Sequence, residues 1–480
     1  MASTGLIDSG KVAALAVLGL LLSVGYWQAA FIWDDVEIFA HVNQTPWLQL
    51  WFEPVTGGRL GGGYYRPLAM SVLKLCAAPY WAHIAAMICH GLSAVAVSLL
   101  LDKRAVWCTL IFLVHPLSNE ILGWASALPD ALALCLGLWA ALSFARRRWG
   151  LVFVFLILGA LSKETAWVPL FAMLICAPKN SARQKGGWIF GGAFGLVLLL
   201  RLLSGVSGGW SIGTKLLLLP NALTWALSML LWPWPLSIVH DLHVVSWSVI
   251  LLGGFAAVGL IGVLWWPRLR FGALMILLSI ALAMPTTIDG GLLGERYCYM
   301  ATAGLALLLG ELYTTLEGNR RQIANGALGL LVAGAVFMHT QRMGDWVSDS
   351  LLFGAAAQAY PESSYAHHFE GVVALHSGDP QRAAVAFERA LQFSYAHVSD
   401  RKLYLMSLVE SERFAEAVAF AEEGAQSGLD AEYLAYWAKA YFNNGQKDAA
   451  LQLLTMLCPK QNACDGPEWV QDLYVTALKE

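Results

Sequence analysis

Charged residues are scarce in this chain. They make up 13% of its 480 residues, whereas hydrophobic residues make up 58%. Soluble domains carry roughly 25% charged residues, so the composition excludes an ordinary water-soluble globule. The chain also lacks a long basic run: the longest is Arg146 to Arg148, and the net charge is −3. These two absences leave no electrostatic basis for nucleic-acid binding.

The few charges are divided unevenly along the chain. Residues 1–344 hold 14 acidic and 21 basic residues, while residues 345–480 hold 19 acidic and 9 basic ones. The first part therefore resembles a membrane protein in composition, and the second part resembles a soluble domain. We expect an all-α chain of two domains, with residues 1–344 in the membrane and residues 345–480 in water.

Cysteine motifs are also few. Cys458 and Cys464 stand in the polar second part, where they permit a small disulfide loop if this part faces an oxidising compartment. No further ligands stand beside them to form a zinc site. The other six cysteines lie in apolar stretches and are interpreted as packing residues: Cys76, Cys89, Cys108, Cys135, Cys176 and Cys298.

Long apolar runs fill the first part. The run from Val12 to Ile32 is long enough to cross the roughly 30 Å hydrocarbon layer, and without a clear cleavage site it is expected to remain as an anchor. Short Lys/Arg-rich segments mark the cytoplasmic side, and neighbouring markers require an even number of crossings between them. The markers are Lys11, Lys103 with Arg104, Arg146 to Arg148, Lys179 with Arg183 and Lys185, Arg268 with Arg270, and Arg320 with Arg321.

This constraint predicts about eleven transmembrane helices, with the N-terminus inside and the second part outside. The expected spans are 12–32, 81–101, 105–117, 127–145, 149–161, 165–177, 187–203, 246–266, 271–287, 297–315 and 323–339. Residues 33–80 and 204–245 then form outer loops. The segment from Lys215 to His240 is interpreted as re-entrant or lying on the outer surface, because one more crossing would invert everything after it.

Most acidic residues of the first part fall on the outer side of this topology. Charges at membrane depth are costly and are usually paired or functional, so their convergence indicates a site; the alternative is a solvated outer face. Arg66, Lys163, His240 and Arg296 fall on the same side. The ten outer carboxylates are Asp34, Asp35, Glu37, Glu53, Glu120, Asp130, Glu164, Asp241, Asp289 and Glu295.

The second part contains an internal repeat. Ala383, Ala417 and Ala450 recur at intervals of 34 and 33 residues in similar surroundings, which is the tetratricopeptide period. Gly378 and Gly445 stand five residues before their alanines, at the expected turn between two helices. The middle repeat has Glu412 there, so its turn is expected to be less regular. About three and a half repeats predict a short α-solenoid that binds a peptide or partner protein, or that only caps the membrane part.

The polar motifs of the outer side can carry chemistry. Asp34 and Asp35 follow the first apolar run directly, where a carboxylate held out of bulk water acts as a general base. With Glu120 or Glu164 they can also hold a divalent metal. A Lys or Arg beside a carboxylate binds phosphate while staying partly compensated in the empty site. Taken singly, each motif is more often a helix cap or a paired helix end.

Together, these motifs resemble those of a known family. Their order is Asp34 with Asp35, Tyr65 to Leu68, His115 with Pro116 and Glu120, Pro129 with Asp130, Ser162 to Glu164, Glu295 to Tyr297 with Tyr299, then Trp346, Leu352 and Phe353 before the repeats. This succession is similar to that of the transmembrane-and-tetratricopeptide O-mannosyltransferases, which belong to the C superfamily of glycosyltransferases (GT-C). The resemblance runs over nearly the whole chain.

The resemblance implies transfer of a sugar from a polyprenyl-phosphate carrier to a hydroxyl, typically of protein Ser or Thr, at the outer membrane face with inversion. It implies Asp34 as the base, Asp35 as an orienting or acceptor-binding residue, and no required cofactor. Arg66, Lys163, Arg296 and His240 would hold the donor phosphate. Supporting roles fall to His115, Glu120, Asp130, Glu164, Asp241, Glu295 and Tyr297.

Two other functions are compatible with a polytopic chain of this kind. A transporter would carry ionisable residues near mid-membrane, and this chain has few. An assembly factor would use its repeats to recruit an outer-face partner. The compact length favours a bacterial inner-membrane protein with a periplasmic repeat part; in a eukaryote that part would face the ER lumen.

The topology makes a direct prediction. A reporter enzyme that is active only outside the cytoplasm, fused after Glu480, is expected to be active. The reason is that eleven crossings from a cytoplasmic N-terminus place the chain's end on the outer side. Activity of a cytoplasm-specific reporter at the same position would contradict the arrangement.

Overall fold

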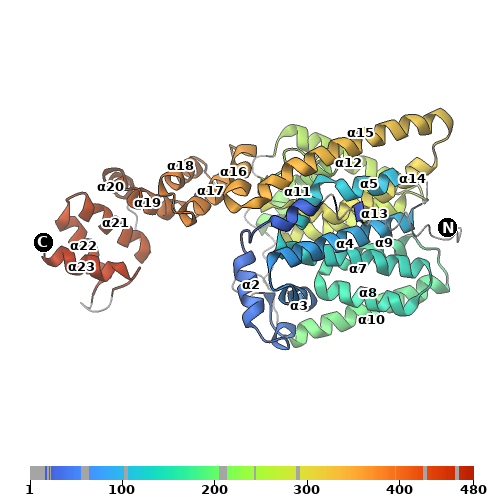
Figure 1. Ribbon diagram of the computed structural model, residues 1–480, viewed down its shortest axis with the longest axis horizontal. Helices are drawn as coiled ribbons and strands as arrows, with labels where there is room; N and C mark the ends of the chain where they lie inside the picture. Colours follow the sequence, from blue (N-terminus) through green and yellow to red (C-terminus); the bar gives the residue numbers. More distant parts are fainter. Residues whose placement is uncertain are drawn as a thin grey trace. The chain divides into compact units, whose positions relative to one another are not determined.

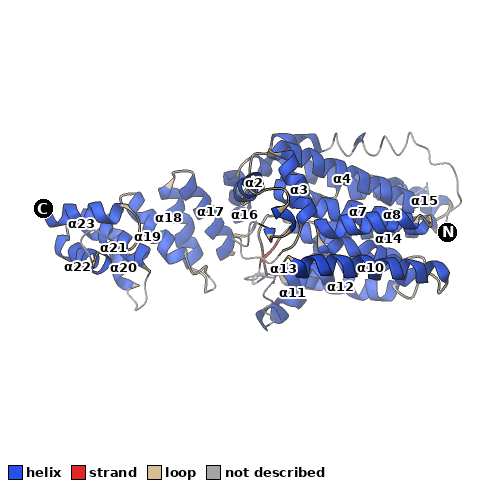
Figure 2. Ribbon diagram, turned by 90° about the horizontal axis from the view of Figure 1, so that it is seen from below, coloured by secondary structure: helices blue, strands red, loops and turns tan. Residues whose placement is uncertain are grey.

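The computed structural model describes residues 14, 17–18, 21, 23–55, 64–101, 106–204, 213–242, 245–287, 292–394, 396–424, 430–459 and 464–479. Within these ranges the chain is almost entirely helical, which confirms the all-α prediction (Figure 1). The described strands are β1 (His240–Asp241) and β2 (Leu292–Leu293), which pair antiparallel (Figure 2). Lys11, Lys103, Arg104, Asp289 and much of the first predicted span lie outside the described residues. Two compact units divide the chain, Met1–Leu352 and Phe353–Glu480.

The first unit is a bundle of helices, whose longer members run along a common direction (Figures 1 and 2). Its α-helices are α2 (Asp35–Gln44), α3 (Pro67–Cys76), α4 (Pro79–Leu100), α5 (Val106–Val114), α6 (Asn119–Gly123), α7 (Leu128–Ala145), α8 (Trp149–Ser162), α9 (Trp167–Cys176), α10 (Ser181–Leu203), α11 (Gly213–Leu231), α12 (Trp247–Val263), α13 (Arg270–Thr287), α14 (Tyr299–Thr314) and α15 (Gly318–Met343). Short 3₁₀ turns connect several of them, including η1 (Val24–Gln28), η2 (Gln49–Trp51), η4 (Pro116–Ser118), η5 (Ala125–Ala127), η6 (Glu164–Ala166), η8 (Glu295–Cys298) and η9 (Gly344–Val347).

Several of these helices are suited to a membrane. Four described helical stretches are long and apolar enough to cross one: Pro79–Leu100, Ala125–Ala145, Ser181–Leu203 and Gly318–Val347. A fifth span is formed if Val106–Val114 and Pro116–Gly123, bent by 48°, count as one. On α10 the large apolar side chains of Trp188 and Leu202 are 81% and 70% exposed. Such a surface is costly in water and favourable in lipid.

Close packing fixes the helices that lead to the polar turns. A Cβ added to Gly272 on α13 would lie 2.6 Å from the backbone nitrogen of Leu308, and one on Gly304 of α14 would lie 2.9 Å from Ile276. These distances are shorter than real contacts, so α13 and α14 approach as closely as they do because both positions lack a side chain. The turn η8, which ends directly before α14, is positioned by this contact.

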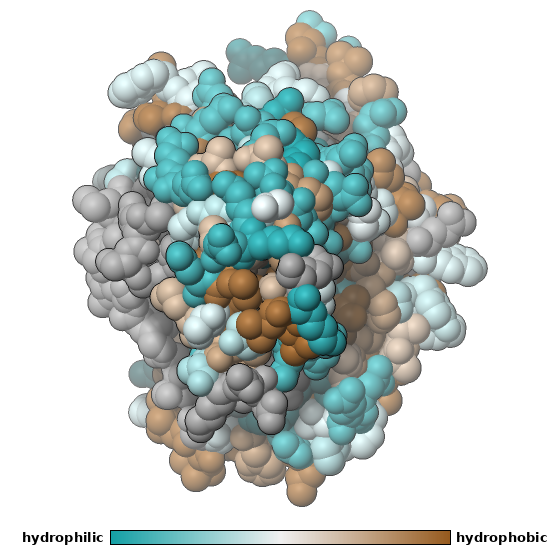
Figure 3. Space-filling model, turned by 90° about the vertical axis from the view of Figure 1, so that its left-hand side faces the viewer, coloured by the Kyte–Doolittle hydropathy of each residue, from teal (hydrophilic) through white to brown (hydrophobic). Residues whose placement is uncertain are grey.

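The second unit is built from helices that pack in consecutive pairs. Helix α16 (Asp349–Ala359) carries the boundary, followed by α17 (Ser364–His376), α18 (Pro380–Leu391), α19 (Asp400–Glu410), α20 (Phe414–Glu423), α21 (Ala431–Asn443), α22 (Lys447–Leu457) and α23 (Trp469–Lys479). The pairs are α17 with α18, α19 with α20, and α21 with α22. Ala383, Ala417 and Ala450, on the second helix of each pair, are completely buried. The face drawn in Figure 3 is mostly hydrophilic, with an apolar group among the polar side chains.

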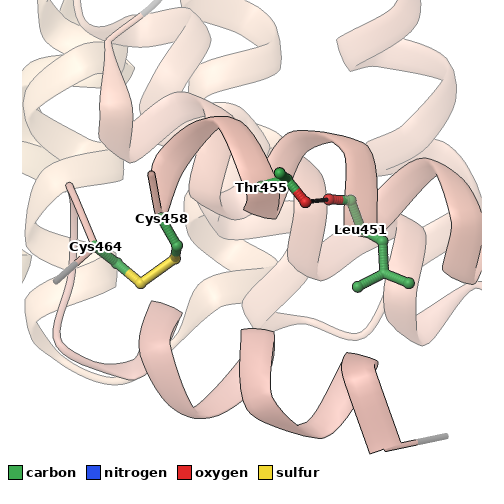
Figure 4. The surroundings of a disulfide bond; sticks show 4 residues. All are labelled: Leu451, Thr455, Cys458 and Cys464. Atoms are coloured by element: carbon green, nitrogen blue, oxygen red, sulfur yellow. Dashed lines mark hydrogen bonds between the residues drawn. A yellow bond between two sulfur atoms is a disulfide. The ribbon is translucent and has the colours of Figure 1, made fainter. Parts of the chain in front are cut away.

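The two cysteines of the polar second part, Cys458 and Cys464, form a disulfide. Cys458 follows α22 directly and is bonded to Cys464 (Figure 4). Its partner lies six residues further along the chain, so the bond closes a small loop before α23. The six cysteines that the sequence assigned to packing are free thiols.

The turns between paired helices are more regular than the sequence predicted. Gly378, Glu412 and Gly445 have φ angles of 74°, 61° and 83°. At each position the backbone N–H donates to the carbonyl three residues earlier, and the next N–H donates to the carbonyl five residues before itself. The prediction of a less regular turn at Glu412 is therefore wrong. The backbone pattern outweighs the steric cost of a side chain in the left-handed region.

That cost is testable. Glu412→Gly is expected to stabilise α19 and α20 by about 0.5 to 1 kcal/mol, because glycine adopts the left-handed conformation without steric penalty but loses more chain entropy on folding. The measurement is hydrogen exchange of peptides from these two helices in the full chain. Gly445→Ala is the matched opposite change and is expected to destabilise α21 and α22 by about 1 kcal/mol. If hydrogen exchange in α19 and α20 is no slower in Glu412→Gly than in the unchanged chain, the argument is contradicted.

Candidate functional site

A cavity of about 230 Å³ in the first unit collects polar residues from distant parts of the chain. It is lined at the start of α2, before α3, at the N-terminal end of α7, at the junction of α8 and η6, and in η8. Seven of the thirteen predicted site residues line it: Asp34, Arg66, Asp130, Lys163, Glu164, Arg296 and Tyr297. Residues 262 positions apart in the sequence thus meet at one place.

Asp34 presents a carboxylate to this cavity. It is the residue before α2, outside the candidate spans, and Trp33 before it has a φ of 55°. Its Oδ1 atom is buried and has no hydrogen-bond partner. Burial raises the pKa of Asp34 to about 6, against the opposing effect of the Arg296 charge. A carboxylate with a raised proton affinity and a free oxygen is equipped to accept a proton.

Asp35 is held very differently. One of its oxygens accepts a hydrogen bond from the Ile32 backbone at 3.1 Å, and the other accepts bonds from the Ser126 backbone at 2.8 Å and from the Ser126 hydroxyl. The side chain is fully buried and does not line the cavity. Burial raises its pKa to about 7, while these hydrogen bonds act in the opposite direction. Asp35 therefore fastens the start of α2 to η5.

Three cations line the cavity, and each is paired with a carboxylate. Arg66 Nη2 lies 3.0 Å from Glu164 Oε1, and Lys163 Nζ lies 2.6 Å from Asp130 Oδ1. The guanidinium of Arg296 contacts Glu120, whose other oxygen accepts the Arg296 backbone N–H at 2.9 Å. This pairing limits the desolvation cost of three positive charges in one cavity.

Aromatic rings lie beside all three cations, with Lys163 Nζ 5.6 Å from the ring centre of Tyr297. The guanidinium of Arg296 lies 4.7 Å from the ring centre of Trp124 and 4.4 Å from that of Tyr297, and it donates to the Tyr297 hydroxyl at 2.7 Å. Arg66 lies 4.6 Å from the ring centre of Tyr64. Cation–π contacts of this kind stabilise a partly desolvated charge. Trp124 and Tyr64 were not predicted as site residues, although Tyr64 directly precedes the Tyr65 to Leu68 motif.

Unpartnered polar atoms gather at the same cavity. Arg66 Nε and Trp124 Nε1 are buried donors without a hydrogen-bond partner, and Asp34 Oδ1 is a buried acceptor without one. Buried polar groups are nearly always satisfied in folded proteins. The Trp124 side chain interacts with Asp34 and lowers its pKa, so the clearest place for a polar ligand is at the unused Arg66 donor.

The other predicted residues lie beside the cavity and do not line it. His240 Nε2 donates to Glu295 at 3.2 Å, while its Nδ1 accepts from Trp225 at 3.2 Å; both residues of the His240 and Glu295 pair are buried. His115 Nε2 donates to the Leu230 carbonyl at 3.2 Å. Asp241 pairs with Leu292 in the small sheet, and Glu120 reaches the cavity only through Arg296. These residues support the walls.

The residues that could hold a metal ion belong to the second unit and do not line the cavity. Within the described ranges, the group of His, Cys, Asp or Glu side chains close enough to share an ion is His368, His397 and Asp400 in the second unit. The predicted alternative of Asp34 and Asp35 with Glu120 or Glu164 does not form such a group. Asp35 and Glu120 are instead occupied by hydrogen-bond donors.

Comparison with known proteins adds no family. No family model, no curated protein and no solved structure matches the chain. The case for a function therefore rests on the geometry of the cavity and on the sequence motifs that meet there.

The burial of the ion pairs predicts their contributions to stability. Glu120→Gln is expected to destabilise the chain by roughly 3 to 5 kcal/mol. The Glu120 side chain is 0% exposed, and its replacement leaves the Arg296 charge without a counter-ion. Thermal unfolding of the purified chain in detergent measures the loss.

Glu164→Gln is the matched control. Its side chain is 40% exposed, so water replaces the lost interaction with Arg66 and the expected loss is below about 1 kcal/mol. Equal destabilisation by the two variants would contradict the claim that Glu120 is the buried anchor of the cavity wall.

Proposed function

We propose that this chain is a membrane glycosyltransferase of the GT-C type. It transfers a sugar from a polyprenyl-phosphate donor to a hydroxyl of a protein Ser or Thr, without a required cofactor. The observation that carries the proposal is the free, buried oxygen of Asp34 in a cavity whose three cations are each balanced by a carboxylate. A carboxylate base next to cations is what transfer from a phosphate donor requires.

In this reaction Asp34 acts as the general base. The acceptor oxygen forms a bond to the anomeric carbon of the sugar as the bond from that carbon to the phosphate oxygen breaks. The hydroxyl proton passes to Asp34, and the electron pair of the breaking bond leaves with the polyprenyl phosphate. A single displacement inverts the anomeric configuration. Asp35, occupied by three donors, holds the backbone that positions Asp34.

The three cations receive the leaving group. Arg66, Lys163 and Arg296 meet a phosphate whose negative charge increases as the bond to the sugar breaks, so they stabilise the transition state more than the bound donor. Their carboxylate partners keep the site close to neutral when it is empty. The unused Arg66 Nε donor adds a hydrogen bond that a sugar or phosphate oxygen can accept.

The membrane setting agrees with a lipid-carried donor. Four or five described helices are suited to cross the membrane, and each of the ten spans expected after the first falls on a helix. We infer eleven crossings, with the cavity on the outer face of a bacterial inner membrane. A polyprenyl chain would then stay in the lipid while its phosphate reaches the cations.

The second unit is proposed to be a tetratricopeptide solenoid that binds the acceptor. Its support is the 34- and 33-residue spacing of Ala383, Ala417 and Ala450, their complete burial, and the shared turn geometry of three consecutive helix pairs. Surfaces of this kind bind extended peptides. A protein acceptor could thus be recruited by one unit and modified by the other.

The base assignment can be tested in reconstituted vesicles. Asp34→Asn is expected to lower sugar transfer from polyprenyl-phosphate mannose by about 10²- to 10⁴-fold, because asparagine cannot take the proton. Release of polyprenyl phosphate and labelling of acceptor proteins are measured together. Glu37→Gln, an exposed change on the first turn of the same helix, is the control and is expected to retain activity.

The same assay has a second readout in its pH dependence. Because the ionised form of Asp34 is the active one and its pKa is about 6, the rate is expected to rise with pH through that region in both the unchanged chain and Glu37→Gln. Asp35, Glu37 and Arg296 are the charges around it, and Glu37→Gln removes one of them. Full transfer by Asp34→Asn would refute the assignment, and absence of transfer by the unchanged chain with any polyprenyl-phosphate sugar would favour an assembly or transport role.

A further inference from the structure

Two histidines and an aspartate come together in the second unit, whereas the residues proposed for sugar transfer belong to the first unit. His368 lies on α17, Asp400 is the first residue of α19, and His397 lies in the connection before α19. One ligand atom from each of the three lies within 4.8 Å of the others. The proposed transfer reaction uses none of them.

Hydrogen bonds orient all three side chains. His368 Nδ1 lies 2.5 Å from Asp400 Oδ1, and the other carboxylate oxygen accepts the His397 backbone N–H at 2.8 Å. The two imidazole rings lie side by side, with centroids 4.5 Å apart. Ser399 Oγ is 2.7 Å from His397 Nδ1. His397 Nδ1 also accepts the Ser399 backbone N–H at 3.3 Å, so two contacts fix the orientation of this ring.

The surroundings are those of a partly closed site. Asp400 is fully buried and His368 is 7% exposed, and the rings of Phe369 and Phe387 lie 5.1 and 6.2 Å from the His368 ring. Apolar neighbours exclude water and strengthen the interaction of an ion with its ligands. A simple structural bond between α17 and α19 explains His368 and Asp400, but it does not explain the second imidazole of His397, which lies beside the first at an interplanar angle of 35°.

We propose that His368, His397 and Asp400 bind a divalent transition-metal ion, with zinc as the best match. Two imidazoles and one carboxylate form a donor set that zinc prefers, and three protein ligands leave a fourth tetrahedral position for water. Metal–ligand bonds of about 2.0 to 2.2 Å place the ligand atoms about 3.3 Å apart. The present separations of up to 4.8 Å are close to this arrangement.

Such an ion would join α17 to α19, which are separated in the sequence by α18. Because these helices belong to consecutive pairs of the second unit, metal binding would stabilise the stacking of the pairs. The inference is independent of the proposed sugar transfer, since it concerns binding by other residues and is read out without any enzymatic assay.

The test uses the full chain purified in detergent, freed of metal with a chelator and then titrated with Zn²⁺ against a coloured competitor. The unchanged chain is expected to bind one more tightly held Zn²⁺ than His397→Ala, whose affinity for that ion falls by at least about tenfold. Titration with Co²⁺ gives a second readout, since the visible absorption of a tetrahedral cobalt site is expected in the unchanged chain and absent in the variant.

His376→Ala is the matched control, because His376 is an exposed histidine at the end of the same α17 helix. It is expected to bind zinc as the unchanged chain does. If His397→Ala loses helical structure by circular dichroism, His397→Gln takes its place, since it keeps a polar side chain at the surface. Equal zinc stoichiometry and affinity in the unchanged chain and a folded His397 variant would overturn the proposal.

Discussion

The architecture of the first unit depends on one constraint: a charge removed from water must have a partner. Arg66 with Glu164, Lys163 with Asp130, and Arg296 with Glu120 each join two different segments. Leaving Arg296 without Glu120 would cost several kcal/mol, and the three pairs together hold the ends of α3, α6, α7 and α8 near η6 and η8. In a chain with few charges, these pairs fix the wall of the cavity.

Asp34 and Asp35 show how the backbone separates two identical side chains. Asp35, at the first position of α2, turns toward η5 and is satisfied by Ile32 and Ser126. Asp34, one position earlier, lines the cavity and keeps a buried oxygen unpartnered. The difference in function proposed for them follows from this difference in placement, because both oxygens of Asp35 are engaged by donors away from the cavity, whereas Asp34 presents its carboxylate to it.

Local patterns in the sequence predicted the helices and the polar motifs well. Apolar runs located ten helices after the first, and seven predicted residues meet in the cavity. What the sequence could not supply are contacts between distant segments. Ser126 and Trp124 have no local signal, and the pairing of β1 with β2, which buries His240, joins segments about 50 residues apart. The His368, His397 and Asp400 cluster was missed for the same reason, since His368 stands 29 positions before His397.

The placement of His240 changes how the cavity wall is understood. The sequence suggested it as a phosphate ligand, yet it donates to Glu295, which also accepts the Ser237 backbone N–H at 2.7 Å. Arg296, the next residue in η8, is held from the opposite side by Glu120. The turn is therefore fixed by two adjacent carboxylate contacts, one to each flanking segment, with α14 packed closely against α13 behind it. A guanidinium on so rigid a turn would lose little conformational entropy on binding the proposed phosphate, so His240 contributes to the cavity wall through the position of Arg296.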